Sequence, residues 1–291
     1  MMYRKIFEQP VTYDFRILFH PSYVLPMIDF IGDNTAVKSY GVCSGMRLIR
    51  HRHSYEAIDH RSECVDYARY VLGVWLLDQK VSEINLSEKD PFYTLYYKYK
   101  YYGMAVSPLD DVIIFSTIFL SQNTNYHKNT VKWMRRILSL YKDPLNLLKI
   151  DREKIMKTIG RSYQITRLVD SLRCYIEKRD EILKRDVRTL LRCPWIGVKT
   201  YFAYRLHVLL DTKYIPLDKN LIRYLSRFFD VKSYKMPRKK LCLIYRECSF
   251  CDLRDSCLEA SLQNRYKDLG GWLQTLTFTE LTRKRIAEED N

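Results

Sequence analysis

The hydrophobic pattern of the first part of the chain differs from that of the rest. Apolar and polar residues alternate over residues 13–20, which is the period of a half-buried β-strand. Residues 37–42 and 46–53 are further strand candidates, separated by a Cys-Ser-Gly sequence that suits a tight turn. A run with few helix breakers, residues 64–79, predicts a helix. We therefore expect residues 1–87 to form a small β-rich domain.

From residue 88 onward, apolar residues recur at helical spacing, so the remainder is expected to be mainly α-helical. We divide it into a helical core, residues 88–230, and a basic C-terminal segment, residues 231–291, in which a Gly-Gly turn leads into a short last helix. The helices expected in the core cover residues 131–141, 165–178, 179–193 and 199–210.

A tight turn with a lysine behind it stands out within the core. Pro194 fixes its own φ, and Gly197 can adopt a positive φ at little steric cost, so the chain can reverse here before the next helix. The start of a helix has unpaired N–H groups and partial positive charge, which suits a phosphate oxygen. The same field disfavours the charged form of Lys199 by about 0.3–1 kcal/mol and favours a nucleophilic amine. Taken alone, a lysine at this position is more often a solvated charge or a phosphate contact than a nucleophile.

Asp218 precedes a second helical run that begins near Leu221, so it is a candidate N-cap. Its carboxylate can serve the same site as Lys199 only if the two helix starts converge. Taken alone, Asp218 is explained by capping.

Residues 191–218 resemble the helix-hairpin-helix and Gly/Pro-rich loop with aspartate of the DNA glycosylase superfamily that includes endonuclease III and 8-oxoguanine DNA glycosylase. The resemblance implies that Lys199 is the Schiff-base nucleophile and Asp218 the catalytic aspartate. Two positions depart from the family pattern, because Trp195 replaces the first hairpin glycine and Tyr201 a small alanine. The resemblance also implies DNA contacts by four hairpin residues: Pro194, Trp195, Gly197 and Thr200.

A second part of the resemblance is an apolar helix that runs into Ser-Gln-Asn-Thr at residues 121–124. It is similar to the first helix of the glycosylase barrel, whose polar end faces DNA. Gln122 and Asn123 would then bind DNA, and Gln122 would fill the gap left by an extruded base. The alternative is a polar helix end exposed to water.

Four closely spaced cysteines, with the pattern C-x5-C-x2-C-x5-C, resemble the [4Fe-4S] loop of endonuclease III, in which the first interval is one residue longer. The resemblance implies an iron-sulfur cluster, with zinc as the alternative cofactor. The interval from Asp218 to the first of these cysteines is shorter than in endonuclease III, so a helix is expected to be absent or moved. The four ligands would be Cys242, Cys248, Cys251 and Cys257.

The other four cysteines are scattered, and we expect buried, reduced thiols at Cys43, Cys64, Cys174 and Cys193. No stretch is apolar for long enough to cross a membrane, and residues 1–10 lack the apolar run of a signal peptide. We therefore expect a cytoplasmic, nucleoid-associated protein in a reducing compartment.

The formal net charge of +15 and the isoelectric point near 9.3 favour a polyanionic partner. The order of elements before residue 92 resembles the antiparallel N-terminal domain of 8-oxoguanine DNA glycosylase and 3-methyladenine DNA glycosylase II. Together, these resemblances imply a monomeric, bifunctional DNA glycosylase and AP lyase, which acts on duplex DNA with a damaged or mispaired base or an abasic site. The alternatives are a non-catalytic helix-hairpin-helix DNA-binding protein and a metal-bearing DNA-binding regulator.

Overall fold

The structure is a computed structural model of the 291-residue chain, and it describes residues 1–78 and 86–289. The described residues form two compact units. Unit 1 comprises residues 1–80 and 101–173, and unit 2 comprises residues 81–100 and 174–291. The domain boundaries expected after residues 87 and 230 do not coincide with this division and stay predictions.

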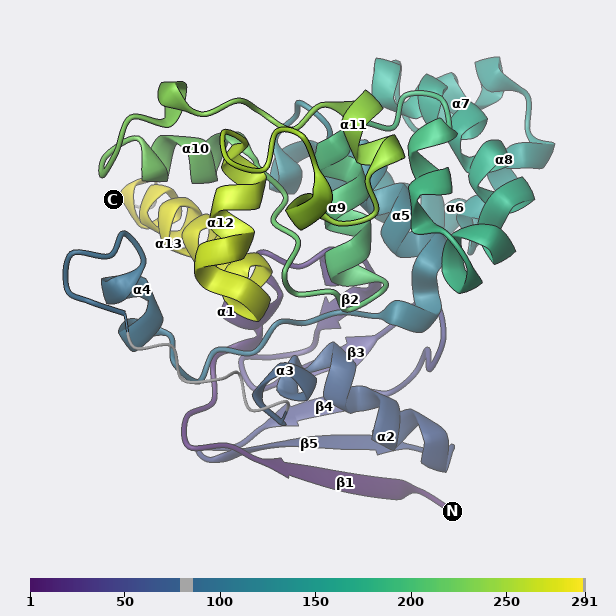
Figure 1. The fold of residues 1–291 in the computed structure, drawn as a ribbon. Coiled ribbons are helices and arrows are strands. Elements are labelled where there is room, and N and C mark those ends of the chain that lie inside the picture. The colour runs from purple at the N-terminus through teal and green to yellow at the C-terminus, as the bar shows by residue number, and fades with distance from the viewer. Residues whose placement is uncertain (79–85, 290–291) are drawn as a thin grey trace. The chain divides into compact units, whose positions relative to one another are not determined.

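A five-stranded antiparallel sheet forms the N-terminal part of unit 1, with the strand order β1-β5-β4-β3-β2 (Figure 1). Phe7 of β1 pairs with Tyr55 of β5, and both side chains are buried. Helix α2 packs against β1 and β5. The expected antiparallel, β-rich N-terminal region is therefore confirmed. The strands are β1 (Tyr3–Glu8), β2 (Ile28–Phe30), β3 (Thr35–Lys38), β4 (Arg47–Arg50) and β5 (Ser54–Asp59).

The strand expected over residues 13–20 is wrong, because this segment contains helix α1 (Phe15–Phe19). The Asp14 carboxylate accepts a hydrogen bond from the backbone N–H of Arg16 and caps the helix. Phe15, Leu18 and Phe19 are buried, and this spacing of three and four residues places them on one helical face. A segment this short fits both periods, and the cap together with the buried face selects the helix.

Among its described residues, unit 1 contains seven α-helices, of which α8 continues into unit 2. The helix expected over residues 64–79 is interrupted at Gly73, whose φ of 75° breaks it into α2 and α3. Helix α5 is apolar and buried over nearly its whole length, as expected of the helix before Gln122. The bounds are α1 as above, α2 (Ser62–Val71), α3 (Val74–Asp78), α5 (Asp111–Leu120), α6 (Lys132–Tyr141), α7 (Arg152–Thr158) and α8 (Tyr163–Lys184).

A buried ion pair joins the sheet to the start of α5. Lys38 Nζ lies 2.8 Å from Asp110 Oδ2, and both side chains are almost fully buried. The Asp110 carboxylate also accepts hydrogen bonds from the Val42 backbone N–H and the Ser107 hydroxyl, each at 2.6 Å. A Cβ at Gly41 would clash with this carboxylate, so the position requires glycine. The paired and hydrogen-bonded carboxylate thereby fixes the helix that leads to Gln122.

Unit 2 is built around α9, in which every side chain from Thr200 to His207 is buried. Helix α13 packs against α10, α12 and α4. The last helix, expected to be short, is 20 residues long. The predicted helix over 179–193 ends earlier, at Lys184, and is followed by a 3₁₀ segment, Val187–Arg192. The remaining helices are α4 (Tyr93–Lys98), α9 (Val198–His207), α10 (Lys219–Leu225), α11 (Lys239–Ile244), α12 (Leu258–Tyr266) and α13 (Gly270–Glu289).

The expectation of reduced thiols at the four scattered cysteines is wrong. Cys43 and Cys64 form a disulfide in unit 1, and Cys174 and Cys193 form one in unit 2. Folding brings the Cα atoms of the two pairs to 5.4 and 5.6 Å, although the partners are 21 and 19 residues apart in sequence. Closing loops of this length restricts the unfolded chain and is worth about 3 kcal/mol for each bridge.

Candidate functional site

The predicted hairpin is present, but the positive φ lies at a different residue from the one expected. Gly197 has a φ of −100° and is the N-cap of α9, whereas Trp195 has a φ of 62°. The left-handed conformation is unfavourable for a bulky side chain. The Trp195 side chain is nevertheless 49% exposed. The indole therefore stands at the surface of a strained turn.

The start of α9 is accessible on the side of Gly197. A Cβ placed on this glycine would meet no atom within 4 Å, and Pro194 and Gly197 are both exposed. The first N–H groups of the helix can therefore be approached by a phosphate oxygen. Thr200, by contrast, is only 4% exposed. Its burial does not favour the predicted DNA contact, which stays a prediction.

Lys199 lies in the first turn of α9 and is only partly exposed. Burial lowers the pKa of its amine below the usual lysine value; Asp218 opposes this shift and Lys219 adds to it. Among the described residues, no hydrogen bond or ion pair engages the Lys199 amine. The side chain is thus a partly buried amine that loses its proton more readily than an ordinary lysine.

Asp218 is held by hydrogen bonds at both carboxylate oxygens. Oδ1 accepts from the backbone N–H of Leu221 at 2.7 Å, which confirms the predicted N-cap of α10. Oδ2 accepts from Gln274 Nε2 at 3.2 Å. Burial raises the pKa of Asp218, and Lys199 together with these donors opposes the shift. Gln274 was missed by sequence reasoning, because no motif marks an amide on a helix more than fifty residues downstream.

The start of α9, which carries Lys199, and the start of α10, which Asp218 caps, therefore lie close enough for the two charges to interact. The sequence alone left this convergence as a condition for a shared site. Loss of water moves both Lys199 and Asp218 toward their neutral forms, while their mutual attraction favours the charged pair. An amine in its neutral form can attack an electrophilic carbon, and the lowered pKa of Lys199 increases the fraction of that form. A fixed carboxylate beside it can stabilise positive charge that develops during such an attack.

Gln122 and Asn123 belong to unit 1, where they follow the C-terminal end of α5. Asn123 is exposed and has a φ of 48°, a conformation that asparagine tolerates better than most residues. The backbone carbonyl of Gln122 accepts a hydrogen bond from Gln164 Nε2 at 2.8 Å. This contact fixes the turn, and the predicted DNA-binding role of both side chains stays a prediction.

The four candidate ligands Cys242, Cys248, Cys251 and Cys257 are free thiols and line one small cavity of about 30 Å³ in unit 2. Leu241, Leu253 and Ala260 contribute apolar walls. Within residues 1–78 and 86–289, no three His, Cys, Asp or Glu side chains converge closely enough to hold one metal ion. The thiols therefore surround a common space without meeting at one point.

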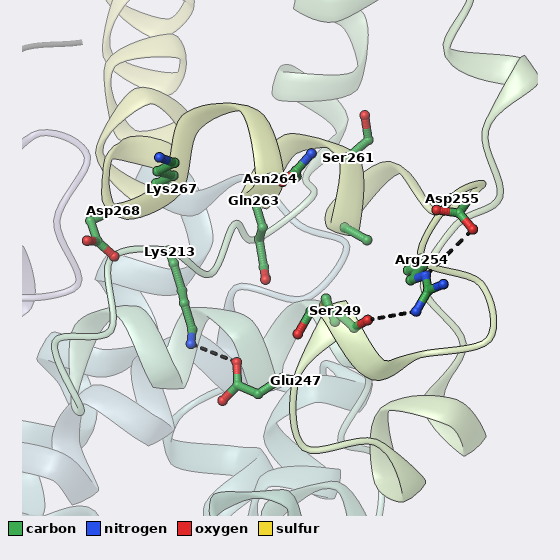
Figure 2. Close-up of a pocket in the computed structure, with 12 residues that line it drawn as sticks. Lys213, Glu247, Ser249, Arg254, Asp255, Ser261, Gln263, Asn264, Lys267 and Asp268 are labelled. Carbon is green, nitrogen blue, oxygen red and sulfur yellow. Dashed lines mark hydrogen bonds and ion pairs between the residues drawn. The ribbon is translucent and has the colours of Figure 1, made fainter.

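A larger polar pocket, of about 760 Å³, lies beside this loop in unit 2 (Figure 2). Figure 2 shows Lys213 directed at Glu247, where Nζ and Oε2 are 2.7 Å apart. Arg254 contacts Asp255 at 3.6 Å. Of the predicted site residues in the described part of the chain, Cys248 alone lines this pocket. Its lining contains three cationic and three anionic side chains, so it presents no net charge.

Replacing Asp218 by asparagine is expected to lower the pKa of Lys199 further, because the carboxylate is the group that opposes the effect of burial. Carbon-13 NMR titration of ε-labelled lysines, with Lys199→Gln used for assignment, measures this pKa. Lys232→Gln, which removes an exposed lysine elsewhere in unit 2, is the control and leaves the Lys199 titration unchanged. An ordinary or increased pKa of Lys199 in Asp218→Asn would contradict the electrostatic coupling.

No helix in the described residues is long and apolar enough to cross a membrane.

No family model matches the chain, and no curated protein matches it. Solved structures do match. MBOgg1 in complex with a low-affinity DNA ligand superimposes with a TM-score of 0.67 at 14% identity, covering 95% of this chain and 94% of that one.

The 8-oxoguanine glycosylase/lyase of Clostridium acetobutylicum is also similar in structure. Bound to double-stranded DNA with cytosine opposite 8-oxoG, it gives a TM-score of 0.66 at 11% identity, with 98% of each chain covered. Its apo form gives 0.65 at 10% identity, covering 96% of this chain and 98% of that one. The mainly helical fold with a small N-terminal antiparallel sheet, expected from the sequence, is therefore confirmed as the fold that these glycosylase structures share.

Proposed function

We propose that this protein is a bifunctional DNA glycosylase and AP lyase of base excision repair. The observation that carries the proposal is the convergence of Lys199 and Asp218 behind an accessible helix-hairpin-helix turn. Burial lowers the pKa of the Lys199 amine and thereby increases the fraction of neutral amine, which is the form that a Schiff-base nucleophile requires. The fold similarity to 8-oxoguanine glycosylase/lyases supports the same function. A non-catalytic DNA-binding protein would gain nothing from desolvating its lysine and fixing a carboxylate beside it.

The mechanism begins when the target nucleotide is extruded from the duplex. The neutral Lys199 amine forms a bond to C1′ of the sugar, while the glycosidic bond breaks and the base leaves with the bonding electrons and a proton. Asp218 stabilises the positive charge that develops on the sugar. After the sugar ring opens, the C1′ adduct is a Schiff base. Removal of a C2′ proton then expels the 3′ phosphate by β-elimination, and this step nicks the strand.

The substrate that we propose is oxidised guanine in duplex DNA, with a single copy of the chain acting on it. This choice rests on the similarity to structures of 8-oxoguanine glycosylase/lyase, one of them bound to DNA with cytosine opposite 8-oxoG. The net charge of +15 favours the phosphate backbone as a partner. An intracellular location agrees with such a substrate, but the Cys43–Cys64 and Cys174–Cys193 disulfides do not fit the reducing compartment that was expected.

We assign a DNA contact to the Trp195 indole. Strained backbone at a bulky residue persists where the surrounding structure enforces it and is concentrated at functional sites. The residue follows the disulfide-bonded Cys193 by two positions and precedes the helix that presents Lys199. Its exposed aromatic face can pack against sugar or base of the DNA strand held at the hairpin.

The four cysteines support an iron-sulfur cluster through their spacing, which differs from that of the [4Fe-4S] loop of endonuclease III by one residue in the first interval. Zinc more often takes two C-x2-C pairs, and this segment has one. In a [4Fe-4S] cluster each thiolate binds a different iron, so the ligands face a common space, and these four thiols line one cavity. Cys242, Cys248, Cys251 and Cys257 would hold the cluster. When bound, it would supply a rigid cross-link for the loop and no step on the substrate.

Borohydride reduction in the presence of 8-oxoG or abasic-site DNA is expected to give a covalent protein–DNA adduct, because a Schiff base is trapped. Lys199→Gln should abolish the adduct, whereas Lys232→Gln should retain it. Gel electrophoresis of the trapped product is the measurement. A wild-type protein without an adduct, or an adduct in Lys199→Gln, would overturn the lyase assignment.

Two variants, Trp195→Gly and Trp195→Ala, are expected to distinguish the effect of backbone strain on stability from the effect of the indole on DNA binding. Both lose the indole and should weaken DNA binding about tenfold. Glycine alone relieves the positive φ, so it should be up to about 1 kcal/mol more stable than the alanine variant. Fluorescence anisotropy with a labelled duplex measures the DNA affinity, and urea unfolding measures the free energy of unfolding. Wild-type affinity in both variants would rule out the contact.

Protein purified without oxygen is expected to be brown, with broad absorbance in the blue region and about four irons and four sulfides per chain. Cys251→Ser should lose this absorbance, and the neighbouring Ser249→Ala should keep it. A colourless protein with about one zinc per chain would show the zinc alternative instead.

A further inference from the structure

A second pocket, in unit 1, has a composition that the proposed catalytic site does not explain. It has a volume of about 300 Å³, at the lower end of the range of small-ligand sites. One wall is the π-helical turn Tyr126–Val131 together with the start of α6, and the other is the end of α7 and the residues after it. Its lining includes Lys128, Lys132, Trp133, Arg136, Lys157 and Gly160.

The charged side chains that line the pocket are all cationic. Its lining includes four cationic side chains and no carboxylate. Lys132, Arg136 and Lys157 are exposed, and none forms an ion pair with any described residue. Glu153 on α7 lies one turn before Lys157 but does not line the pocket. The unit 2 pocket shown in Figure 2 has equal numbers of cationic and anionic side chains in its lining. The two pockets therefore differ clearly in the net charge of their linings.

The shape of the pocket depends on Trp133 and Gly160. The Trp133 Nε1 atom lies 3.5 Å from the position that a Cβ on Gly160 would take, and Gly160 has a φ of 150° that favours glycine. The neighbouring Thr158 hydroxyl donates to the Lys154 carbonyl at 2.8 Å and pairs with the Tyr141 hydroxyl at 3.1 Å. These contacts fix the wall formed by the end of α7.

We propose that this pocket binds a phosphodiester group of the DNA backbone. The inference rests on the proposed function and adds a second site at which the protein holds DNA. This site belongs to unit 1 and takes no part in the chemical steps. Four cations around a concave space neutralise phosphate better than the same charges spread over a flat surface. The π-helical wall begins three residues after Asn123, so the phosphate site continues the segment that carries the predicted DNA-binding amides.

The test compares two triple variants that each remove three exposed cations from unit 1. The pocket variant is Lys132→Gln/Arg136→Gln/Lys157→Gln. The matched control is Arg47→Gln/Lys149→Gln/Lys154→Gln, in which the exposed side chains lie outside the pocket lining. Affinity for a fluorescein-labelled duplex with an abasic-site analogue is measured over a series of salt concentrations. Circular dichroism verifies that both variants are folded.

The pocket variant is expected to bind about tenfold more weakly at about 100 mM salt, and its log–log salt slope should fall by about one for each phosphate that the variant no longer neutralises. The control should bind at most about twofold more weakly, because its three cations lie outside the pocket. Wild-type affinity and slope in the pocket variant, or an equally weakened control, would overturn the proposal.

Borohydride trapping with DNA at saturating concentration separates this proposal from the proposed function. The pocket variant should still form the Lys199 adduct, because only its phosphate-binding cations are removed and the nucleophile remains. If the wild-type protein forms no adduct but the pocket variant still binds DNA more weakly, the lyase assignment fails and the phosphate site stands. If the adduct forms in all proteins and affinities are equal, the phosphate site fails alone.

Discussion

The joint burial of Lys199 and Asp218 is the constraint on which the candidate site depends. Each group loses water and shifts toward its neutral form, and each limits the shift of the other. This balance requires a rigid frame, since a looser one would let water restore ordinary pKa values. Helix α9 supplies the frame for the lysine through its almost completely buried surface. The aspartate is fixed by the start of α10 and by Gln274.

Close packing of α13 sets the position of the Gln274 amide. A Cβ on Gly270 would lie 2.6 Å from the Ile215 side chain, and one on Gly271 would clash with Leu206. The two glycines therefore allow the start of a long helix to lie directly against the segment around residues 206–215. The strained Trp195 depends on a similar restraint, because the Cys174–Cys193 disulfide holds the chain just before it and α9 holds the chain just after it.

Sequence patterns predicted the architecture where periodicity and local chemistry agreed. The buried helix before Gln122 and the cap at Asp218 are examples, because each depends on residues close in sequence. Residues 13–20 were assigned wrongly, because a short segment with aromatic residues satisfies two periods at once and tertiary burial decides between them. The positive φ was expected at Gly197 on the basis of residue type, but the geometry of the turn requires it at Trp195.

The sequence by itself determined the chemical groups: an amine at a helix start, a capping carboxylate, four closely spaced thiols and an excess of positive charge. Their local spacing was enough, because turns, caps and short loops depend on neighbouring residues. The tertiary structure alone decided which distant groups meet. It paired Cys43 with Cys64, brought Gln274 to Asp218 and placed Lys157 beside Lys132. Such contacts are set by how helices pack, and packing has no signature within one segment.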